Sequence, residues 1–134
     1  MFNYLIKIEY DGTNFVGWQS QKNGKSIQDS IEKAVKKVLG KKIRIIGAGR
    51  TDKGVHAYEQ SANFFFDKEI TDKYKFLSSV NFFLKKKLIS IISLSNKNLN
   101  FHARHSVKKK KYKYIILNRL TSSPLYQYRS WVIK

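Results

Sequence analysis

The chain has 134 residues, enough for about one domain, and its 42% hydrophobic and 14% aromatic residues exclude a disordered protein. It carries 27 Lys and Arg against nine Asp and Glu, a formal charge of +18, which favours a nucleic-acid partner over a membrane surface. The lack of cysteine excludes disulfides, and there is neither a signal peptide nor an apolar run of the roughly 20 residues that span a bilayer. We therefore expect a soluble, cytoplasmic protein, although Lys enrichment can also reflect genomic base composition.

The first third of the chain predicts a strand, a turn and a helix. Apolar residues recur at every second position from Tyr4 to Tyr10, which is typical of a half-buried strand, and a polar Gly-containing cluster over 11–14 ends it. Ser26 has the position of a helix N-cap with Asp29 three residues on, and apolar residues follow at helical spacing up to Gly40. Gly40 is suited to the left-handed cap that ends a helix.

The remaining chain predicts five more strands and one more helix, with no internal repeat. In chain order we expect a short strand over 43–46, a glycine-bounded loop over 47–54, a strand near 58–66, a helix over 71–84 with Tyr74, Leu77, Val80 and Leu84 on one side, and strands over 88–94, from about 110 to 117, and from 130 onward. The order β-α-β-β-α-β predicts an α+β fold of ferredoxin-like, RNA-recognition-like type, with two helices packed on one face of an antiparallel sheet.

The loop from Gly47 to His56 is the most unusual segment, because its three glycines would let the backbone approach a ligand. It fits neither a Walker loop nor a dinucleotide-binding fingerprint, since its Lys and Gly spacings differ from both. What remains is one carboxylate, Asp52, between Arg50 and Lys53, which favour the ionised form that a nucleophile or base needs. A structural Asp that hydrogen-bonds its own turn is the alternative, and it stays open at this point.

Two other kinds of chemistry are poorly supported by the residues. Glycoside hydrolysis ordinarily needs two carboxylates, and the remaining acids are scattered along the chain. His102 and His105 are three residues apart, but no cluster of Cys or acidic residues accompanies them, so we expect no metal site.

The segment Gly-Ala-Gly-Arg-Thr-Asp-Lys-Gly-Val-His-Ala at 47–57 closely resembles the signature of the TruA-type tRNA pseudouridine synthases. Further segments agree in order and spacing, and the resemblance covers essentially the whole chain. They are Ile8–Gly12 continuing through Gly17–Gln19, Val80–Asn81, Phe101–Arg104 and Lys111–Ile116. The resemblance implies one half of the pseudouridine synthase fold.

The family likeness also implies an activity, the isomerisation of uridine to pseudouridine in the anticodon stem-loop of tRNA. Asp52 matches the aspartate required to break and re-form the glycosidic link, by a route that remains open between nucleophilic attack and a glycal. Tyr112 matches a tyrosine that packs against the target uracil, and Arg50 an arginine that holds the nucleotide out of the stack. No metal or cofactor is implied, and the complete enzyme is expected to be a homodimer.

Basic residues near these positions are candidates for contacts with RNA phosphates. They are Lys53, Arg104, Lys108, Lys109, Lys110 and Lys111. Each assignment has a structural alternative: the lysine run can be a solvated strand edge, and Tyr112 can be ordinary core beside Tyr114 and Ile116. We expect Asp52 to lie at the floor of a positively lined groove that admits an unstacked nucleotide.

The sequence departs from the family in its length, because family members are about twice as long and carry a second, related domain that closes the cleft. We expect residues 1–134 to form a single domain, the catalytic-aspartate half, with weak or no activity alone, as a truncated piece or a natural half. One rival is a non-catalytic RNA-binding module with a ferredoxin-like sheet. Another is an assembly protein whose last strand pairs with a second chain.

Overall fold

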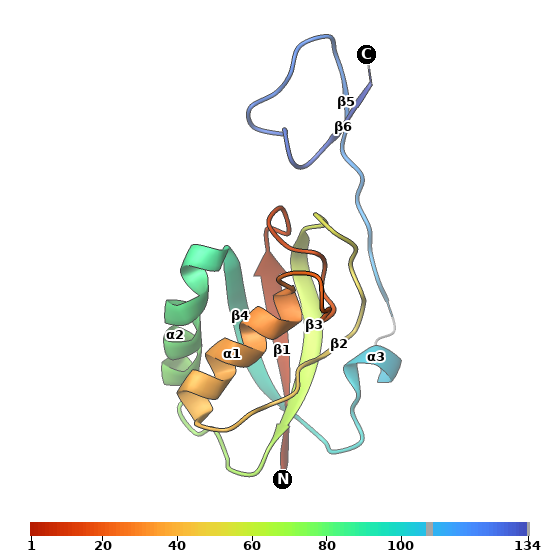
Figure 1. The fold of residues 1–134 in the computed structure, drawn as a ribbon. Coiled ribbons are helices and arrows are strands. Elements are labelled where there is room, and N and C mark those ends of the chain that lie inside the picture. The colour runs from red at the N-terminus through yellow and green to blue at the C-terminus, as the bar shows by residue number, and fades with distance from the viewer. Residues whose placement is uncertain (107–108, 134) are drawn as a thin grey trace.

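The computed structural model describes residues 1–106 and 109–133, which form a four-stranded sheet with helices and a small two-stranded sheet (Figure 1). The elements in chain order are β1 (Phe2–Tyr10), α1 (Ile27–Leu39), β2 (Ile46–Gly47), β3 (Ala57–Phe66), α2 (Lys73–Leu84), the 3-10 turn η1 (Lys85–Lys87), β4 (Ile89–Lys97), α3 (Ala103–Ser106), β5 (Ile116–Asn118) and β6 (Trp131–Ile133). The main sheet has the order β2-β3-β1-β4, and every neighbouring pair is antiparallel. The expected ferredoxin-like α+β fold is confirmed.

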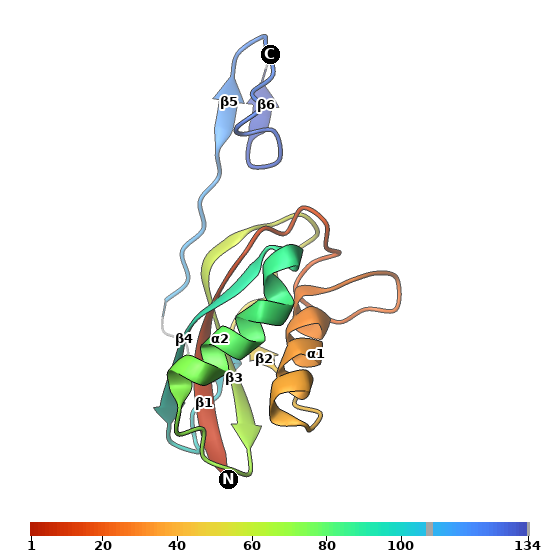
Figure 2. The same ribbon diagram turned by 90° about the vertical axis from the view of Figure 1, so that its left-hand side faces the viewer.

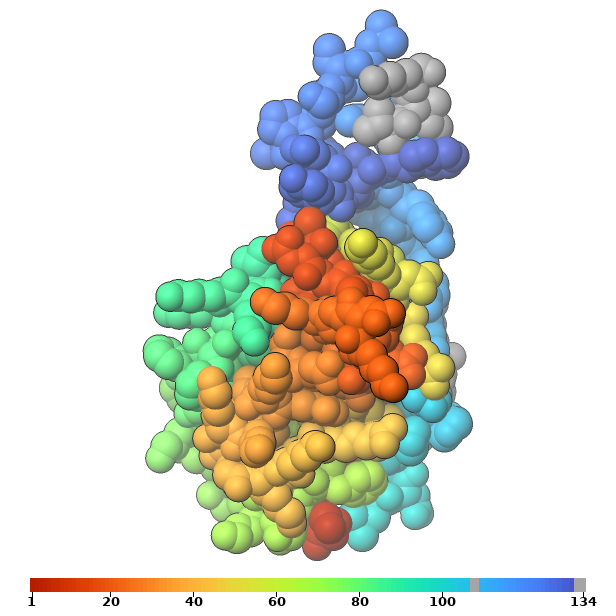
Figure 3. All heavy atoms as spheres, in the orientation of Figure 1, coloured from red at the N-terminus to blue at the C-terminus, as the bar shows by residue number. Residues whose placement is uncertain are grey.

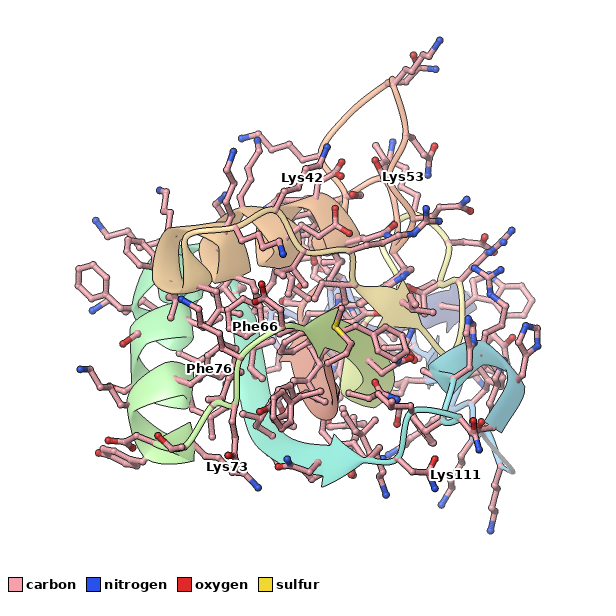
Figure 4. The ribbon with its side chains drawn as sticks, turned by 90° about the horizontal axis from the view of Figure 1, so that it is seen from below. Lys42, Lys53, Phe66, Lys73, Phe76 and Lys111 are labelled. Atoms are coloured by element: carbon pink, nitrogen blue, oxygen red, sulfur yellow. The ribbon has the colours of Figure 1, made fainter. Side chains whose placement is uncertain are left out.

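The helices α1 and α2 cover one face of the main sheet and bury a single core against it (Figure 2). The central strand β1 supplies Tyr4, Ile6 and Ile8, all at most 1% exposed, because its apolar side chains alternate toward the helices. Phe66 of β3 and Phe76 of α2 lie between the sheet and the helices, while Lys42 and Lys73 point outward (Figure 4).

The caps of α1 form as the sequence predicts. The Ser26 hydroxyl accepts a hydrogen bond from the Asp29 amide at 3.0 Å, and Gly40 takes the left-handed conformation at φ 73° with its amide bonded to the Lys36 carbonyl. In α2, the buried residues are Phe76, Val80 and Leu84 at four-residue spacing. Our placement of Tyr74 on that face is wrong, since Tyr74 lies two residues before Phe76 and is 83% exposed.

The other face of β1 is covered at its start by the segment over 98–103, so this part of the strand is buried on both faces. Asn3 donates to the carbonyls of Asn98 (2.9 Å) and Phe101 (2.8 Å). The Asn63 amide in turn donates to Asn3 and accepts from the Ala103 amide group, at 2.9 and 2.8 Å. These buried amides dock the segment before α3 by satisfying its backbone polar groups.

The predicted strand over 43–46 is wrong in extent, because only Ile46 and Gly47 pair with β3. Ile43 and Ile45 are nevertheless buried in the core. The Ile45 amide donates to the Glu32 carboxylate and its carbonyl accepts from Gln28, both at 2.9 Å. Side chains of α1 therefore satisfy the backbone that a neighbouring strand would otherwise pair with.

The predicted strand from about 110 to 117 is also wrong for most of its length. Residues 109–115 have no regular secondary structure, and only Ile116–Asn118 form β5, which pairs in parallel with β6. The alternating aromatic pattern misled because its faces are not buried: Tyr114 is 88% exposed. The segment over 116–133 projects beyond the main body (Figures 1 and 3), and the predicted strand from 130 corresponds to β6.

Among the described residues, no helix has both the length and the apolar character to cross a membrane.

Candidate active site

The loop over 48–56 lies at one end of the sheet, where it packs against the loop that follows β1. The Trp18 amide donates to the Thr51 carbonyl at 3.0 Å, so the two loops are joined backbone to backbone. Glycine permits this approach: a Cβ on Gly17 would lie 2.6 Å from the Thr51 carbonyl oxygen, and one on Gly12 would overlap the Val55 carbonyl. The signature loop is thus held by the protein itself.

The glycines of the signature loop differ in what they approach. We had expected Gly47 to let the backbone approach a ligand. A Cβ on Gly47 would instead lie 2.5 Å from the Trp18 indole nitrogen, so the glycine makes room for a buried tryptophan. Gly54 adopts φ 78° in open surroundings, where the left-handed conformation itself favours glycine. A Cβ added to Gly49 would have its nearest neighbouring atom 3.8 Å away, so this position has room for a side chain.

The Asp52 side chain is exposed at the tip of this loop. Its backbone carbonyl closes the turn by accepting from the Val55 amide at 3.1 Å. Within the described residues the Asp52 carboxylate has no hydrogen bond, and neither Arg50 nor Lys53 lies within ion-pair distance of it. The turn is therefore closed by backbone, and the carboxylate is available to an external ligand.

Tyr10 lies beside this loop, and Tyr112 is close enough to Tyr10 to affect its pKa. The Tyr10 and Thr51 hydroxyls are 2.8 Å apart. Burial raises the pKa of Tyr10, the hydrogen bond with Thr51 opposes this rise, and the neighbouring Tyr112 hydroxyl adds to it. Tyr112 is itself 68% exposed, so the alternative that it is ordinary core is wrong.

The strip over 109–112 runs beside the signature loop in both ribbon views (Figures 1 and 2). The Lys110 ammonium lies 3.9 Å from the position that a Cβ on Gly49 would take. Lys109, Lys110 and Lys111 are all exposed, and Lys111 points outward (Figure 4). The described residues thus bring an exposed aromatic ring and several cations to the loop that carries Asp52.

A network of charges that our sequence analysis did not predict joins three parts of the chain beside this loop. The Asp11 carboxylate accepts from the Thr13 amide (3.0 Å) and pairs with the Arg129 guanidinium (2.6 Å). His56 Nδ1 lies 3.1 Å from the same carboxylate, and its Nε2 donates to the Tyr128 carbonyl at 2.7 Å. The only local signal for it is the Asp-Gly-Thr turn, because Arg129 is 118 residues from Asp11.

Two opposing effects act on the Asp11 carboxyl. Burial raises its pKa, but the hydrogen bonds from Thr13 and the nearby His56 and Arg129 together hold the pKa of Asp11 below its usual range. The Gly12 amide also donates to His56 Nδ1 at 2.9 Å, which ties His56 to the turn that carries Asp11. Asp11 therefore remains ionised and fixes both loops to the projecting segment.

The remaining predicted site residues are more scattered. Arg50 and Lys53 are exposed on the loop, whereas Arg104 is exposed on α3. Lys108 lies outside the described residues. The rings of His102 and His105 stack with centroids 4.6 Å apart, and among the described residues no three potential ligands gather around a metal position.

The groove expected around Asp52 stays a prediction. Two hollows, of about 490 and 530 Å³, lie along α1 and α2, and Asp52 lines neither. The Asp52 side chain itself is exposed.

The family model described as tRNA pseudouridine synthase matches residues 6–106, which include most of the main sheet and the loop that presents Asp52. The chain therefore belongs to the tRNA pseudouridine synthase family.

The chain is 53% identical over 133 residues to tRNA pseudouridine synthase A of Pelagibacter ubique, covering 99% of this chain and 54% of that relative. It is 44% identical over 133 residues to the protein of the same name from Thermoanaerobacter sp., covering 99% and 54%. With the Caldicellulosiruptor saccharolyticus protein of that name it shares 48% identity over 118 residues, covering 88% and 48%. The chain spans about half the length of these curated relatives.

Proposed function

We propose that this chain is the aspartate-bearing half of a tRNA pseudouridine synthase, with Asp52 as the catalytic carboxylate. The observation that carries the proposal is the exposed Asp52 carboxylate, free of partners among the described residues, on a loop fixed by its neighbours within the family match. The relatives that share up to 53% identity with the chain are named tRNA pseudouridine synthase A. The proposed substrate is uridine in the anticodon stem-loop of tRNA.

The proposed reaction moves one bond and leaves the composition of the nucleotide unchanged. The N1–C1′ bond of uridine breaks, the base turns, and a C5–C1′ bond forms. The hydrogen on C5 leaves to solvent and N1 gains a proton, so no electrons are gained or lost and no cofactor is needed. An ionised carboxylate is suited both to nucleophilic attack, at the ribose C1′ or the uracil C6, and to the glycal route. Both routes use the same group, Asp52.

Tyr112 and Arg50 support the extrusion of the target base. Removing a base from a stack costs a few kcal/mol, and stacking on an aromatic ring recovers about 1–3 kcal/mol. Tyr112 exposes 68% of its surface and lies near the Tyr10–Thr51 pair, where its ring can stack on uracil. Arg50 is exposed two residues before Asp52 and can occupy the vacated space. Lys53, Lys109–Lys111 and Arg104 are proposed to neutralise RNA phosphates.

The Asp52 side chain is exposed, and we propose that a second domain of the same fold covers it. The chain covers about half of each relative, and closure of a site over an extruded base excludes water from the reaction. Residues 1–134 are thus proposed to have weak or no activity until they meet that second half. The complete enzyme is proposed to act in the cytoplasm as a homodimer.

A tritium-release assay tests this proposal directly. The substrate is tRNA labelled with tritium at C5 of uridine, and the chain is assayed alone and with the separately produced part of the Pelagibacter ubique relative that it does not cover. We expect release only from the combined halves, reduced at least about a thousandfold by Asp52→Asn. The control Asp67→Asn, at another exposed aspartate, should retain activity. Rapid release by the chain alone would disprove the need for a second domain.

A non-catalytic RNA-binding module remains the second candidate, because Tyr112, Tyr114 and the lysines of the same strip are exposed together. Exposed aromatics among cations are typical of surfaces that bind single-stranded RNA. Asp52→Asn should preserve tRNA binding under either proposal. Combined halves that bind tRNA tightly but form no pseudouridine would favour the module.

A further inference from the structure

A concave patch of lysines lies on the helical side of the molecule. We define the helical-face hollow as the space of about 490 Å³ lined by Lys33, Lys36 and Lys37 of α1, Lys87 of η1 and Phe83 of α2, with three small residues of α1 and its cap. It opens where α1 (orange) meets the end of α2 and η1 (green to turquoise) in Figure 3. Figure 2 shows that these helices lie on the opposite side of the sheet from the strip over 109–112.

The charges in this hollow are all positive. Its lining includes four lysines and no acid, and none of these four forms an ion pair with an acid of the described residues. The Lys37 ammonium lies 4.9 Å above the Phe83 ring centre, so the aromatic ring holds one cation in place. Partial burial and repulsion by Lys33, Lys25 and Lys37 together lower the pKa of Lys87. An anion would relieve this repulsion.

The neighbouring hollow provides a comparison within the same helical layer. Its volume is about 530 Å³, and it shares Lys37 and Phe83 with the helical-face hollow. Its other lysines, Lys68 and Lys75, line it together with Glu69 and Asp72. Those lysines have acidic neighbours that balance their charge locally. The helical-face hollow lacks this balance, which distinguishes it from the general basic surface of the chain.

We propose that the helical-face hollow binds the phosphodiester backbone of tRNA outside the arm that reaches Asp52. This inference rests on the proposed tRNA substrate. Lysine ammonium groups suit phosphate oxygens, and a curved phosphate backbone fits a concave surface lined by cations. A lipid surface would instead require apolar side chains that insert below the headgroups around the cations. The hollow and the strip over 109–112 lie on opposite sides of the sheet (Figure 2), so a folded RNA with two arms contacts both more readily than a single stem does.

Charge reversal with a matched control tests the site. The variant Lys33→Glu/Lys37→Glu/Lys87→Glu removes three cations of the hollow. The control Lys68→Glu/Lys73→Glu/Lys75→Glu changes three exposed lysines elsewhere on the helical side. Each replacement lowers the formal charge by two, so both variants fall from +18 to +12. Fluorescence anisotropy measures Kd for labelled tRNA, and for its isolated anticodon stem-loop, over a series of salt concentrations.

We expect the hollow variant to weaken tRNA binding at least about tenfold more than the control does. Its dependence of log Kd on log salt should also become shallower by about two, since each lost phosphate contact contributes about 0.7–0.9. Binding of the isolated stem-loop should be equally weak in both variants. Equal losses of tRNA binding in the two variants would overturn the proposal. So would lysine-dependent binding of the chain to phosphatidylserine vesicles together with unchanged tRNA binding in the hollow variant.

Two further measurements keep the outcome interpretable. Should the glutamate variant fail to unfold cooperatively on heating, the Lys→Gln variants at the same six positions replace both sets and should give the same order of effects. Asp52→Asn should leave the tRNA affinity unchanged. Pseudouridine formation that persists in Asp52→Asn, or that is absent from the unmodified combined halves, would count against the catalytic proposal alone if hollow-dependent tRNA binding is intact.

Discussion

At the residue scale, the signature loop separates the group proposed for catalysis from the groups that hold it. Asp52 is exposed without a side-chain partner among the described residues, whereas Thr51 on one side and Val55 on the other contact the loop that follows β1. A change at Asp52 can therefore alter chemistry without altering the fold.

We predict that Asp52→Asn changes the free energy of unfolding by less than about 0.5 kcal/mol, because it removes an exposed carboxylate that bonds to nothing in the described chain. Urea unfolding at pH 7 measures this difference. A loss of 2 kcal/mol or more would mean that Asp52 is a structural residue, as the simplest interpretation of its glycine-rich turn suggests.

The glycines provide a second residue-scale prediction. Gly47→Ala places a methyl group 2.5 Å from the buried Trp18 indole and should destabilise the fold by about 1–3 kcal/mol, the usual cost of overpacking. Gly49→Ala is the matched control, since its nearest neighbour would be 3.8 Å away, and it should be nearly neutral. Trp fluorescence during urea unfolding reports on both variants, and equal stabilities would contradict the packing found at Gly47.

The sequence could predict single residues only where they belong to a short, contiguous motif. Asp52, Arg50 and Tyr112 were identified from the family resemblance, and their roles stay predictions. The contact of Asp11 with Arg129 joins the two ends of the chain, and no periodicity or spacing carries such information. The same holds for the Asn3–Asn63 pair, which looks in the sequence like two ordinary polar positions.

At the element scale, helix ends were predictable because caps are local. Ser26 and Gly40 act within one turn of α1, so their residue types suffice to locate both ends. The strands over 43–46 and 110–117 were not, because a strand needs a partner. Glu32 and Gln28 bind the backbone of Ile45 in place of a strand, and the second segment mostly lies beside the signature loop without pairing.

The charge network around Asp11 is an element-scale feature with a pH dependence. The folded-state pKa of Asp11 is below its usual value near 4, so its ionised form stabilises the fold above that pH, and this contribution is lost as pH falls through the lowered pKa. We predict that Asp11→Asn costs about 1 kcal/mol at pH 7 and that the cost shrinks below about pH 4. Urea unfolding of both proteins between pH 2 and pH 7 measures it. A cost that is independent of pH would show that the carboxylate charge has no role.

At the scale of the whole molecule, the structure consists of a body and a projection. The body comprises the sheet with α1, α2 and α3, whereas the projection over 116–133 contains the small parallel sheet (Figure 1). Side-chain bonds of His56 and Arg129 join the projection to the body. The order of the body's elements was predictable from periodicity, but the projection has too few local signals to reveal its path.

We predict that trypsin first cleaves the chain in the strip over 109–113, because its lysines are exposed and its backbone has no regular secondary structure. Lys36 and Lys37 are the internal control, since they are equally exposed but lie in the hydrogen-bonded helix α1. Mass spectrometry of early digests identifies the cut. Early cleavage within α1 would contradict the relative stabilities that this arrangement implies.

The projection has a further consequence for how copies of the chain behave toward one another in solution. Leu120, Leu125 and Trp131 are between 69% and 81% exposed there, and such an apolar surface favours contact with the same surface of another copy. The net charge of +18 opposes this contact, because it makes the molecules repel one another. Added salt shortens the range of that repulsion from about 10 Å at 0.1 M to about 3 Å at 1 M, but it leaves the exposed apolar side chains of the projection unchanged. High salt concentrations are commonly used to remove bound RNA from basic proteins. They are therefore the conditions under which this chain will aggregate.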